Sequence, residues 1–144
     1  MKKTLEQIIK ELETFSTNHK QINDFGFGDI SNISTKDHNF PMMWVQPTPS
    51  VIGKMIELNL DIYIIDLLKQ DRSNLLSIMS DTLLIGNDII SEYFDSEDDF
   101  EFVVEETAVD ATPFEGEFDD FTAGFLFNIQ VQIAHDYSKC EVPN

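Results

Sequence analysis

Ile56-Glu57-Leu58-Asn59-Leu60-Asp61-Ile62-Tyr63-Ile64 is the stretch of this 144-residue sequence that decides the fold. Every second residue in it is Ile or Leu, and the residues between them are polar except for Tyr63. Successive side chains of a β-strand point to opposite faces of its sheet, so this alternation predicts a long strand. An apolar face opposite a mostly polar one indicates that the sheet is covered on one side only.

A second stretch near the C-terminus alternates in the same way. Its apolar residues are Ala123, Phe125, Phe127, Ile129, Val131 and Ile133. The residues between them are polar after Leu126. This pattern predicts another long strand whose outer face is polar.

Two segments have helical spacing instead. Thr4 and Gln7 fit a capping box, and the apolar residues that follow predict an amphipathic helix over about residues 4–19. A second helix is expected over about residues 73–94. Gly86 lies inside it and costs about 1 kcal/mol relative to alanine, which indicates a kink or close packing at that residue.

Shorter elements complete the expected fold. Residues 25–30 contain two glycines and lead into a first strand at 31–33, and a short strand with a proline at each end covers 40–47. Residues 47–50 read as a loop, a strand runs from about 100 to 109, and residues 112–116 read as a turn or bulge. The order α-β-β-β-α-β-β predicts a single α+β domain over residues 1–144, with a mostly antiparallel sheet and two main helices on one face.

Charge is concentrated in the second half of the chain. The net charge is −18; residues 1–72 hold eight Lys/Arg and ten Asp/Glu, whereas residues 73–138 hold sixteen Asp/Glu and no Lys or Arg. Internal ion pairs cannot neutralise such a segment, so it is a solvated face, repels polyanions or meets a basic partner. Phosphate-mediated binding of nucleic acid is disfavoured because it needs clustered Lys and Arg.

No membrane or secretion signal is recognisable. The apolar runs are far shorter than the roughly twenty residues that span a bilayer, and no apolar segment follows Lys2 and Lys3 as in a signal peptide. The single cysteine, Cys140, allows no internal disulfide. We expect a cytoplasmic chain when it is made, with no membrane partner.

Motifs for catalysis, cofactors and metals are weak. Gly26-Phe27-Gly28 lacks the third glycine and the following helix of a nucleotide-binding loop, so a structural glycine pair is favoured. Residues 95–106 place acids as a calcium loop does, but Phe100 occupies the position that needs glycine. The three histidines have no metal-ligand spacing to one another or to Cys140. We therefore expect no enzyme activity, cofactor or dedicated metal site.

One cluster combines two methionines with the only tryptophan, at Met42, Met43 and Trp44. Core packing is the default interpretation of such a cluster. Trp and Met are also enriched where proteins meet, so these three residues are candidates for an interface.

The chain as a whole resembles small neck and tail proteins of tailed bacteriophages, of the tail-terminator or tail-completion type. The resemblance spans most of residues 3–143 and rests on the initial helix, a Phe27-Gly28-Asp29-Ile30 strand, Phe40-Pro41-x-x-Trp44-Val45 and the long strand from Met55. It continues through a central helix that opens near Asp71-Arg72-Ser73-Asn74, the Asp120-x-x-Ala123-Gly124-Phe125 strand and Cys140-Glu141-Val142-Pro143. It implies a structural virion protein of the neck or head-tail connector, made in the host cytoplasm. In the tail terminator's case that protein forms a ring of six copies through which the genome passes, and a ring of twelve is the alternative.

The charge asymmetry adds an expectation about this ring. Carboxylates that line a bore repel phosphate, so DNA passes without specific binding. The candidate acids for the bore, or for docking other neck and tail proteins, are Asp95, Glu97, Asp98, Asp99, Glu101, Glu105, Glu106, Asp119 and Asp120. The subunits would meet head to tail through sheet edges and the acidic loop.

Two other function classes remain open at this point. The first is an acidic interaction module, such as a DNA-mimicking inhibitor that occupies a basic groove of a protein partner. The second is a metal-dependent enzyme that uses the acidic cluster, with Asp98 and Glu106 as its test residues.

Overall fold

The two long alternating stretches form the middle of one sheet. The computed structural model describes residues 4–34, 36–53, 55–95, 102–104, 109–116 and 121–134. Strands β3 (Met55–Leu67) and β6 (Thr122–Ala134) pair antiparallel along their whole length. The prediction of two long strands is confirmed.

Further strands widen this pair into a sheet, six-stranded over the described residues. On one side β2 (Met42–Ile52) pairs antiparallel with β3, and β1 (Asp24–Phe27) pairs parallel with β2. On the other side β5 (Asp110–Glu115) and β4 (Phe102–Val104) pair antiparallel with successive parts of β6. The sheet therefore has a β1 flank and a β4/β5 flank.

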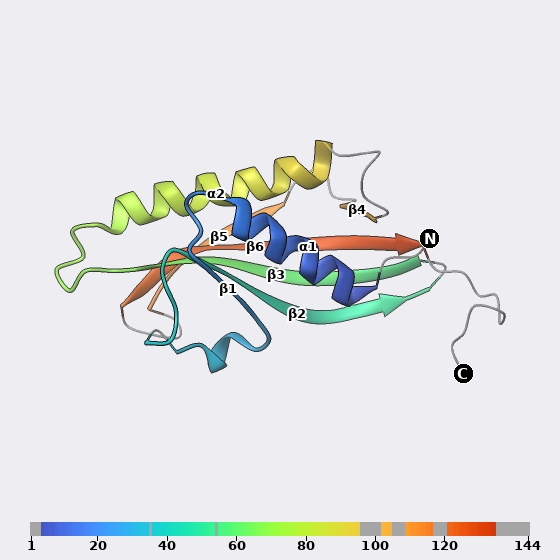
Figure 1. Ribbon diagram of the computed structural model, residues 1–144, viewed down its shortest axis with the longest axis horizontal. Helices are drawn as coiled ribbons and strands as arrows, with labels where there is room; N and C mark the ends of the chain where they lie inside the picture. The colour runs from blue at the N-terminus through green and yellow to red at the C-terminus, as the bar shows by residue number, and fades with distance from the viewer. Residues whose placement is uncertain are drawn as a thin grey trace.

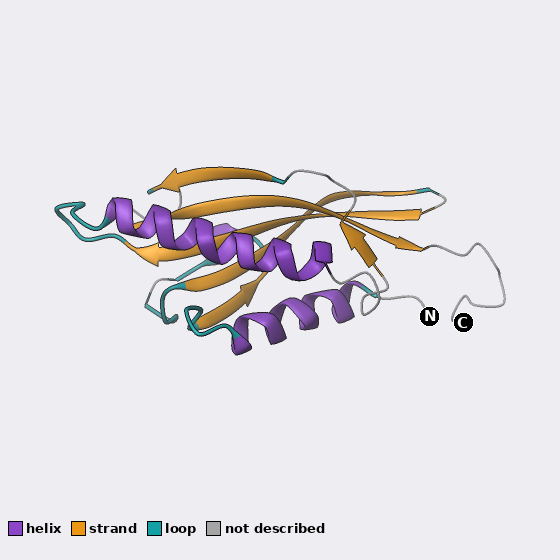
Figure 2. Ribbon diagram, turned by 90° about the horizontal axis from the view of Figure 1, so that it is seen from above, coloured by secondary structure: helices purple, strands orange, loops and turns teal. Residues whose placement is uncertain are grey.

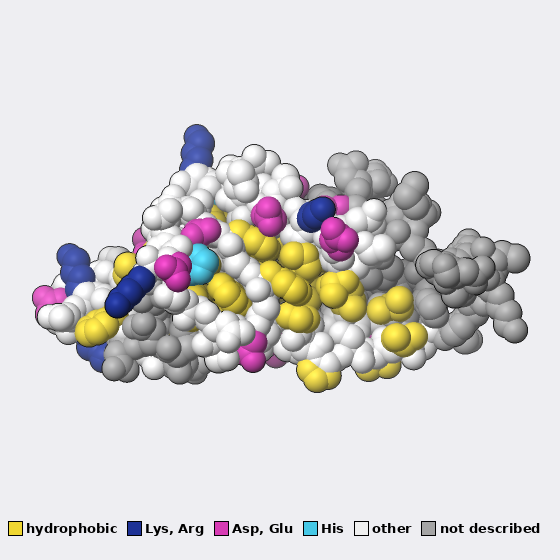
Figure 3. All heavy atoms as spheres, turned by 60° about the horizontal axis from the view of Figure 1, so that its bottom comes forward, with side chains coloured by type: hydrophobic (Ala, Val, Ile, Leu, Met, Phe, Trp, Pro, Cys, Tyr) yellow, Lys and Arg dark blue, Asp and Glu magenta, His cyan; other side chains and the backbone are white. Residues whose placement is uncertain are grey.

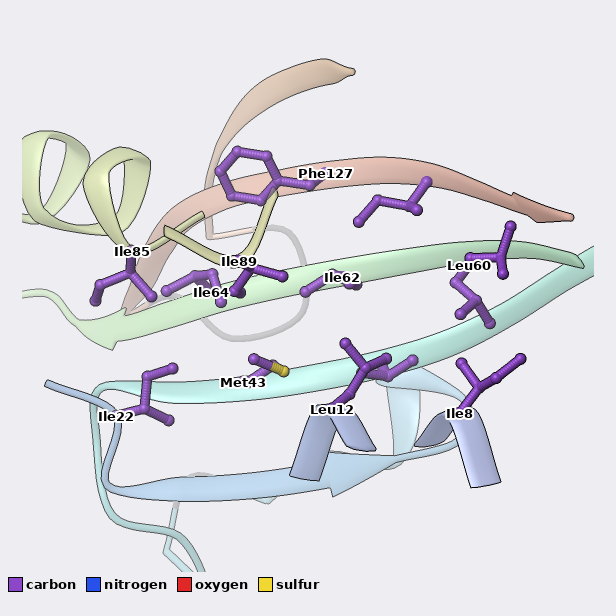
Figure 4. Close-up of a cluster of buried hydrophobic side chains, with 13 residues drawn as sticks. Ile8, Leu12, Ile22, Met43, Leu60, Ile62, Ile64, Ile85, Ile89 and Phe127 are labelled. Carbon is purple, nitrogen blue, oxygen red and sulfur yellow. The ribbon is translucent and has the colours of Figure 1, made fainter. Parts of the chain in front are cut away.

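Both helices lie on one face of this sheet (Figures 1 and 2). Helix α1 (Leu5–Asn18) contacts β1, and α2 (Leu75–Asp95) contacts β6 and β3. Figure 4 shows how side chains of the helices and of the sheet meet in one buried cluster, which includes Ile8, Leu12, Leu60, Ile62, Ile64, Ile85, Ile89 and Phe127. The α+β class and the placement of the helices on a single face are confirmed.

The starts and contacts of the helices follow from local sequence. Thr4 caps α1 as expected: its hydroxyl accepts from the Gln7 N–H at 3.2 Å, and the Gln7 side chain accepts from the Thr4 N–H at 2.9 Å. Gly86 of α2 marks close packing, because a Cβ there would overlap the ring of Phe127. No helix in the described part of the chain is long and apolar enough to cross a membrane.

The opposite face of the sheet carries a second, smaller core. Met42, Trp44, Tyr63, Ile65 and Phe114 are buried there. The prediction that the sheet is covered on one side only is therefore wrong for this half of β3. The residues that cover Tyr63 come from distant segments, so the local alternation carried no signal of them.

The first strand lies earlier than the sequence indicated. Residues 24–27 form β1, whereas residues 30–32 form a short 3-10 helix. The Asp29 carboxylate accepts from the Ser31 N–H at 3.0 Å, and this local bond favours the turn over extended backbone. Gly26 lets the Trp44 ring lie directly against β1, and Trp44 Nε1 donates to the Gly28 carbonyl at 2.9 Å.

Two predicted loops are strands. Residues 47–50 continue β2, with a register shift between Thr48 and Val51. Here Asn59 of β3 donates its side-chain amide to the Pro49 carbonyl at 2.8 Å, which holds the proline segment against the sheet. Residues 112–115 belong to β5. Pairing with a long neighbour decides both cases, and a proline is tolerated because no described strand pairs with the outer edge of either segment.

Candidate interaction surface

The sheet face away from the helices changes from apolar to polar along the strands. Residues directly opposite each other in an antiparallel pair share a face, so the register defines rows across the sheet. One row is Trp44, Tyr63 and Leu126, and belongs to the smaller core. The next row is Gln46, Asp61, Asn128 and Asp110, and the row after it is Thr48, Asn59 and Gln130.

We call this surface the polar face; it comprises Thr48, Glu57, Asn59, Asp61, Asp110, Asn128 and Gln130. Asn128 Nδ2 donates to Asp61 Oδ1 at 2.6 Å, and Gln130 Nε2 donates to Glu57 Oε2 at 3.2 Å. These bonds join β3 to β6 above the sheet. A shallow hollow of about 240 Å³ is lined by five residues of the polar face and by Leu60 and Ile129; the five are Thr48, Asn59, Asp61, Asn128 and Gln130.

The polar face is negative. Its three carboxylates come from Glu57, Asp61 and Asp110, and none of its seven residues is Lys or Arg. The amides of Asn128 and Gln130 fix the orientation of two of these carboxylates. Such a surface repels phosphate groups and accepts hydrogen bonds from cationic side chains.

Nearly all the acids that the sequence singled out lie outside the described residues. These are Glu97, Asp98, Asp99, Glu101, Glu105, Glu106, Asp119 and Asp120, and Asp95 is described only as the last residue of α2. Residues 102–104, inside the stretch that superficially matched a calcium loop, form β4 on β6. The alternation of β3 is enough to place Glu57 and Asp61 on one face of a strand. Only the sheet register shows that Asp110 of β5 lies on the same face.

Met42, Met43 and Trp44 are core residues. Their side chains are 0%, 0% and 6% exposed. Met43 belongs to the core under the helices, and Met42 and Trp44 belong to the smaller core. This corrects the interface expectation, because side chains buried within one chain offer a partner almost no surface.

Two histidines pair with carboxylates away from the polar face. His19 Nε2 lies 2.9 Å from Asp88 Oδ2 and links the end of α1 to α2. His38 Nδ1 lies 3.0 Å from Asp24 Oδ2. Burial alone would raise the pKa of Asp24, but hydrogen bonds from the Phe25 and Asn39 N–H groups and from His38 hold it below its ordinary value. The contacts of Asp24 with Asn39 and His38 hold the segment before β2 against β1.

A second carboxylate is perturbed in the opposite direction. Burial raises the pKa of Asp66 above its ordinary value, and the nearby Asp81 carboxylate adds to this rise. The hydrogen bond that Asp66 accepts from the Leu67 N–H lowers the pKa but does not outweigh them. The two acids come from β3 and α2. Over the described ranges, no three His, Cys, Asp or Glu residues gather in a way that could hold a metal ion.

Comparison with known proteins does not assign the chain. No protein-family model matches it, and no curated protein matches it in sequence.

Proposed function

We propose that this protein is a structural component of a tailed-phage virion. Copies of it assemble into a ring at the neck or at the end of the tail tube, in the manner of a tail terminator or tail-completion protein. The ring contacts other neck and tail proteins, and genome DNA passes through its bore without specific binding. The protein is made in the host cytoplasm, ends up in the virion and works by assembly, not by catalysis.

The polar face is the observation that supports this proposal best. It is a sheet surface that no helix or strand of the described residues covers, with carboxylates at Glu57, Asp61 and Asp110, opposite the face that carries both helices. A protein whose sheet lines a passage for DNA needs a hydrated surface that does not bind phosphate. The sheet would then form the inner wall of the ring, with the helices outside it.

The order of elements and the charge distribution support the same proposal. The initial helix, the long strand from Met55, the central helix and the late strand on which the resemblance rests are all present as elements, in that order. Residues 73–138 carry sixteen acids without a Lys or Arg. The ring of six is the proposed stoichiometry and a ring of twelve is its alternative.

The first experiment is light scattering on the purified protein across protein concentration and salt, with electron microscopy of any assembly. The proposal predicts a closed ring, or a monomer that closes into one when salt screens its charge. It also predicts that the assembled protein does not retard double-stranded DNA in a gel at low salt. Rings that retain DNA would contradict the proposed passage.

A second candidate is an acidic interaction module that occupies a basic groove. The same concentration of acids favours it. It predicts a monomer or dimer under every condition and tight, salt-sensitive binding to a DNA-binding protein, which DNA competes away. The oligomeric mass measured by light scattering separates the two proposals, and this measurement needs no partner protein.

A further inference from the structure

The sheet has outer edges on both flanks, and an added strand can pair only with such an edge. Over the described residues these edges belong to β1, to the part of β2 that extends beyond β1, to β5 and to β4. An edge strand presents the backbone N–H and C=O groups of every second residue to the outside, and an added strand bonds to these groups. The register shows which residues point outward.

In β5 the odd-numbered residues point their backbone groups outward. The Gly116 N–H donates to the Thr122 carbonyl at 2.9 Å, so Gly116 faces β6. The even-numbered residues of β5 face β6 too, because the direction alternates along a strand and this pairing has no register shift. The outward residues are therefore Ala111, Pro113 and Glu115. The middle one has no N–H to donate to an added strand.

The outer edge of β2 begins with a proline. The Gly28 N–H donates to the Val45 carbonyl at 3.0 Å, so Val45 faces β1. Pro47 comes two residues later and faces the same side, where no described strand continues β1. A strand added along β2 beyond β1 would meet Pro47 first and then the register shift between Thr48 and Val51.

A side chain occupies the outer edge of β1. Gly28 faces β2, so Phe25 and Phe27 point their backbone groups outward. The Phe25 N–H donates to Asp24 Oδ1 at 2.8 Å. The other carboxylate oxygen of Asp24 accepts from the Asn39 N–H at 3.1 Å, which brings the segment before β2 to this edge. An added strand would have to displace these contacts.

The remaining edge is that of β4, which has three residues (Phe102–Val104). A strand of this length points only one or two residues outward, which is too few for a stable pairing. Each edge strand of the described sheet thus has a feature that opposes the addition of a strand.

We infer that this sheet is closed to strand addition on both flanks, so that copies of the protein meet through side chains and not through a shared sheet. Prolines, a carboxylate and a short strand act at separate edges, and none of them depends on the others. An open edge would let copies join in chains without a fixed end, whereas a ring needs one defined contact. The part of the inference that concerns contact between copies rests on the proposed ring function. It departs from the contact through sheet edges that we expected from the sequence.

Side chains are available for such a contact. Hydrophobic side chains gather on the face of the molecule that Figure 3 shows. The large hydrophobic side chains that are exposed include Ile52, Leu76 and Leu84. Side chains of this kind pack against a neighbour without any backbone donor.

Restoring the missing donors tests the inference. Pro113→Val gives β5 an outward N–H and a residue that favours strands, and Pro47→Val does the same for β2. Each variant is expected to raise the constant for self-association about tenfold or more, as regained backbone hydrogen bonds would. Light scattering measures this constant at fixed salt, and hydrogen exchange locates the new contact.

Thr112→Val is the matched control. It adds an apolar, β-branched side chain to β5 at an exposed residue whose N–H already faces β6, so it should associate as the parent does. In associated Pro113→Val, the amides of Ala111 and Glu115 should exchange about tenfold more slowly than in the parent. All variants are checked for an unaltered circular dichroism spectrum, and Pro47→Val keeps the test valid where Pro113→Val does not fold.

The outcomes separate this inference from the proposed function. Folded proline variants that associate no more than Thr112→Val does would overturn the inference. An electron microscopy map of the parent ring in which strands of neighbouring copies pair would overturn it as well and leave the ring intact. Associating proline variants, with a ring whose copies share no sheet, support it. A parent that forms no ring at any salt or concentration overturns the proposed function, and the proline variants then still decide whether the edges are closed.

Discussion

Replacing Gly86 with alanine sets helix propensity against tertiary packing. Glycine inside a helix is about 1 kcal/mol less favourable than alanine, so α2 by itself would be stabilised by the change. The structure predicts the opposite result. The new Cβ would overlap three atoms of the Phe127 ring, and even the farthest of them, Cε1, would lie only 2.5 Å away.

The magnitude follows from how little room the ring has. Carbon atoms in contact are about 3.5–4.0 Å apart, so the ring would have to move by roughly 1 Å or more. Phe127 is 3% exposed and is packed in the main core, and overfilling a core typically costs about 1–3 kcal/mol. After subtraction of the propensity gain of about 1 kcal/mol, we expect Gly86→Ala to destabilise the protein by up to about 2 kcal/mol.

Urea unfolding, followed by circular dichroism and by Trp44 fluorescence, measures this difference. Asn87→Ala is the matched control, because residue 87 is the next residue of α2 and is exposed. It should gain roughly half a kcal/mol from propensity alone.

A double-mutant cycle then assigns the cause. Phe127→Leu removes the ring atoms that a Cβ at position 86 would meet, so Gly86→Ala should become neutral or stabilising in that background. The expected coupling is about 2 kcal/mol. Equal stabilisation by Gly86→Ala in both backgrounds would refute the packing of Phe127 against Gly86.

Three further predictions concern carboxylates, two of them one residue each and the third a pair. Asp66→Asn should stabilise the protein by roughly half a kcal/mol at neutral pH, because the raised pKa of Asp66 shows that its ionised form is disfavoured in the folded chain. The gain should vanish in acid, where Asp66 is protonated in the folded and in the unfolded chain. Urea unfolding across pH measures this, and a stability difference that stays the same at low pH would contradict it. Asp24→Ala should destabilise the protein by about 1–2 kcal/mol at neutral pH through lost hydrogen bonds. Because the pKa of Asp24 is lowered, its contribution is present above the ordinary pKa and fades as the pH falls through the lowered one, so the variant and the parent should converge in acid. The double variant Glu57→Lys with Asp61→Lys should retard double-stranded DNA in a gel at low salt. A double variant that leaves the mobility of DNA unchanged would count against a role of the polar face in repelling DNA.

The polar face was partly predictable from the sequence. The alternation of β3 is enough to place Glu57, Asn59 and Asp61 on one side of a strand. It carries no information about which strands pair with β3. Asp110 joins this surface because β5 pairs with β6 in one particular register, and a shift of one residue would turn it to the other face.

The sequence by itself determined the elements whose signals are local and long. The period of two in β3 and β6, the capping box of α1 and the helical spacing of α2 each repeat over enough residues to outweigh competing conformations. Only the tertiary structure decided the rest. It drew residues 47–50 into β2, buried Trp44 and Tyr63 on the second face, and set Gly86 against Phe127. In each case the deciding contact joins residues far apart in the chain, and the energy of such a contact is absent from any local pattern.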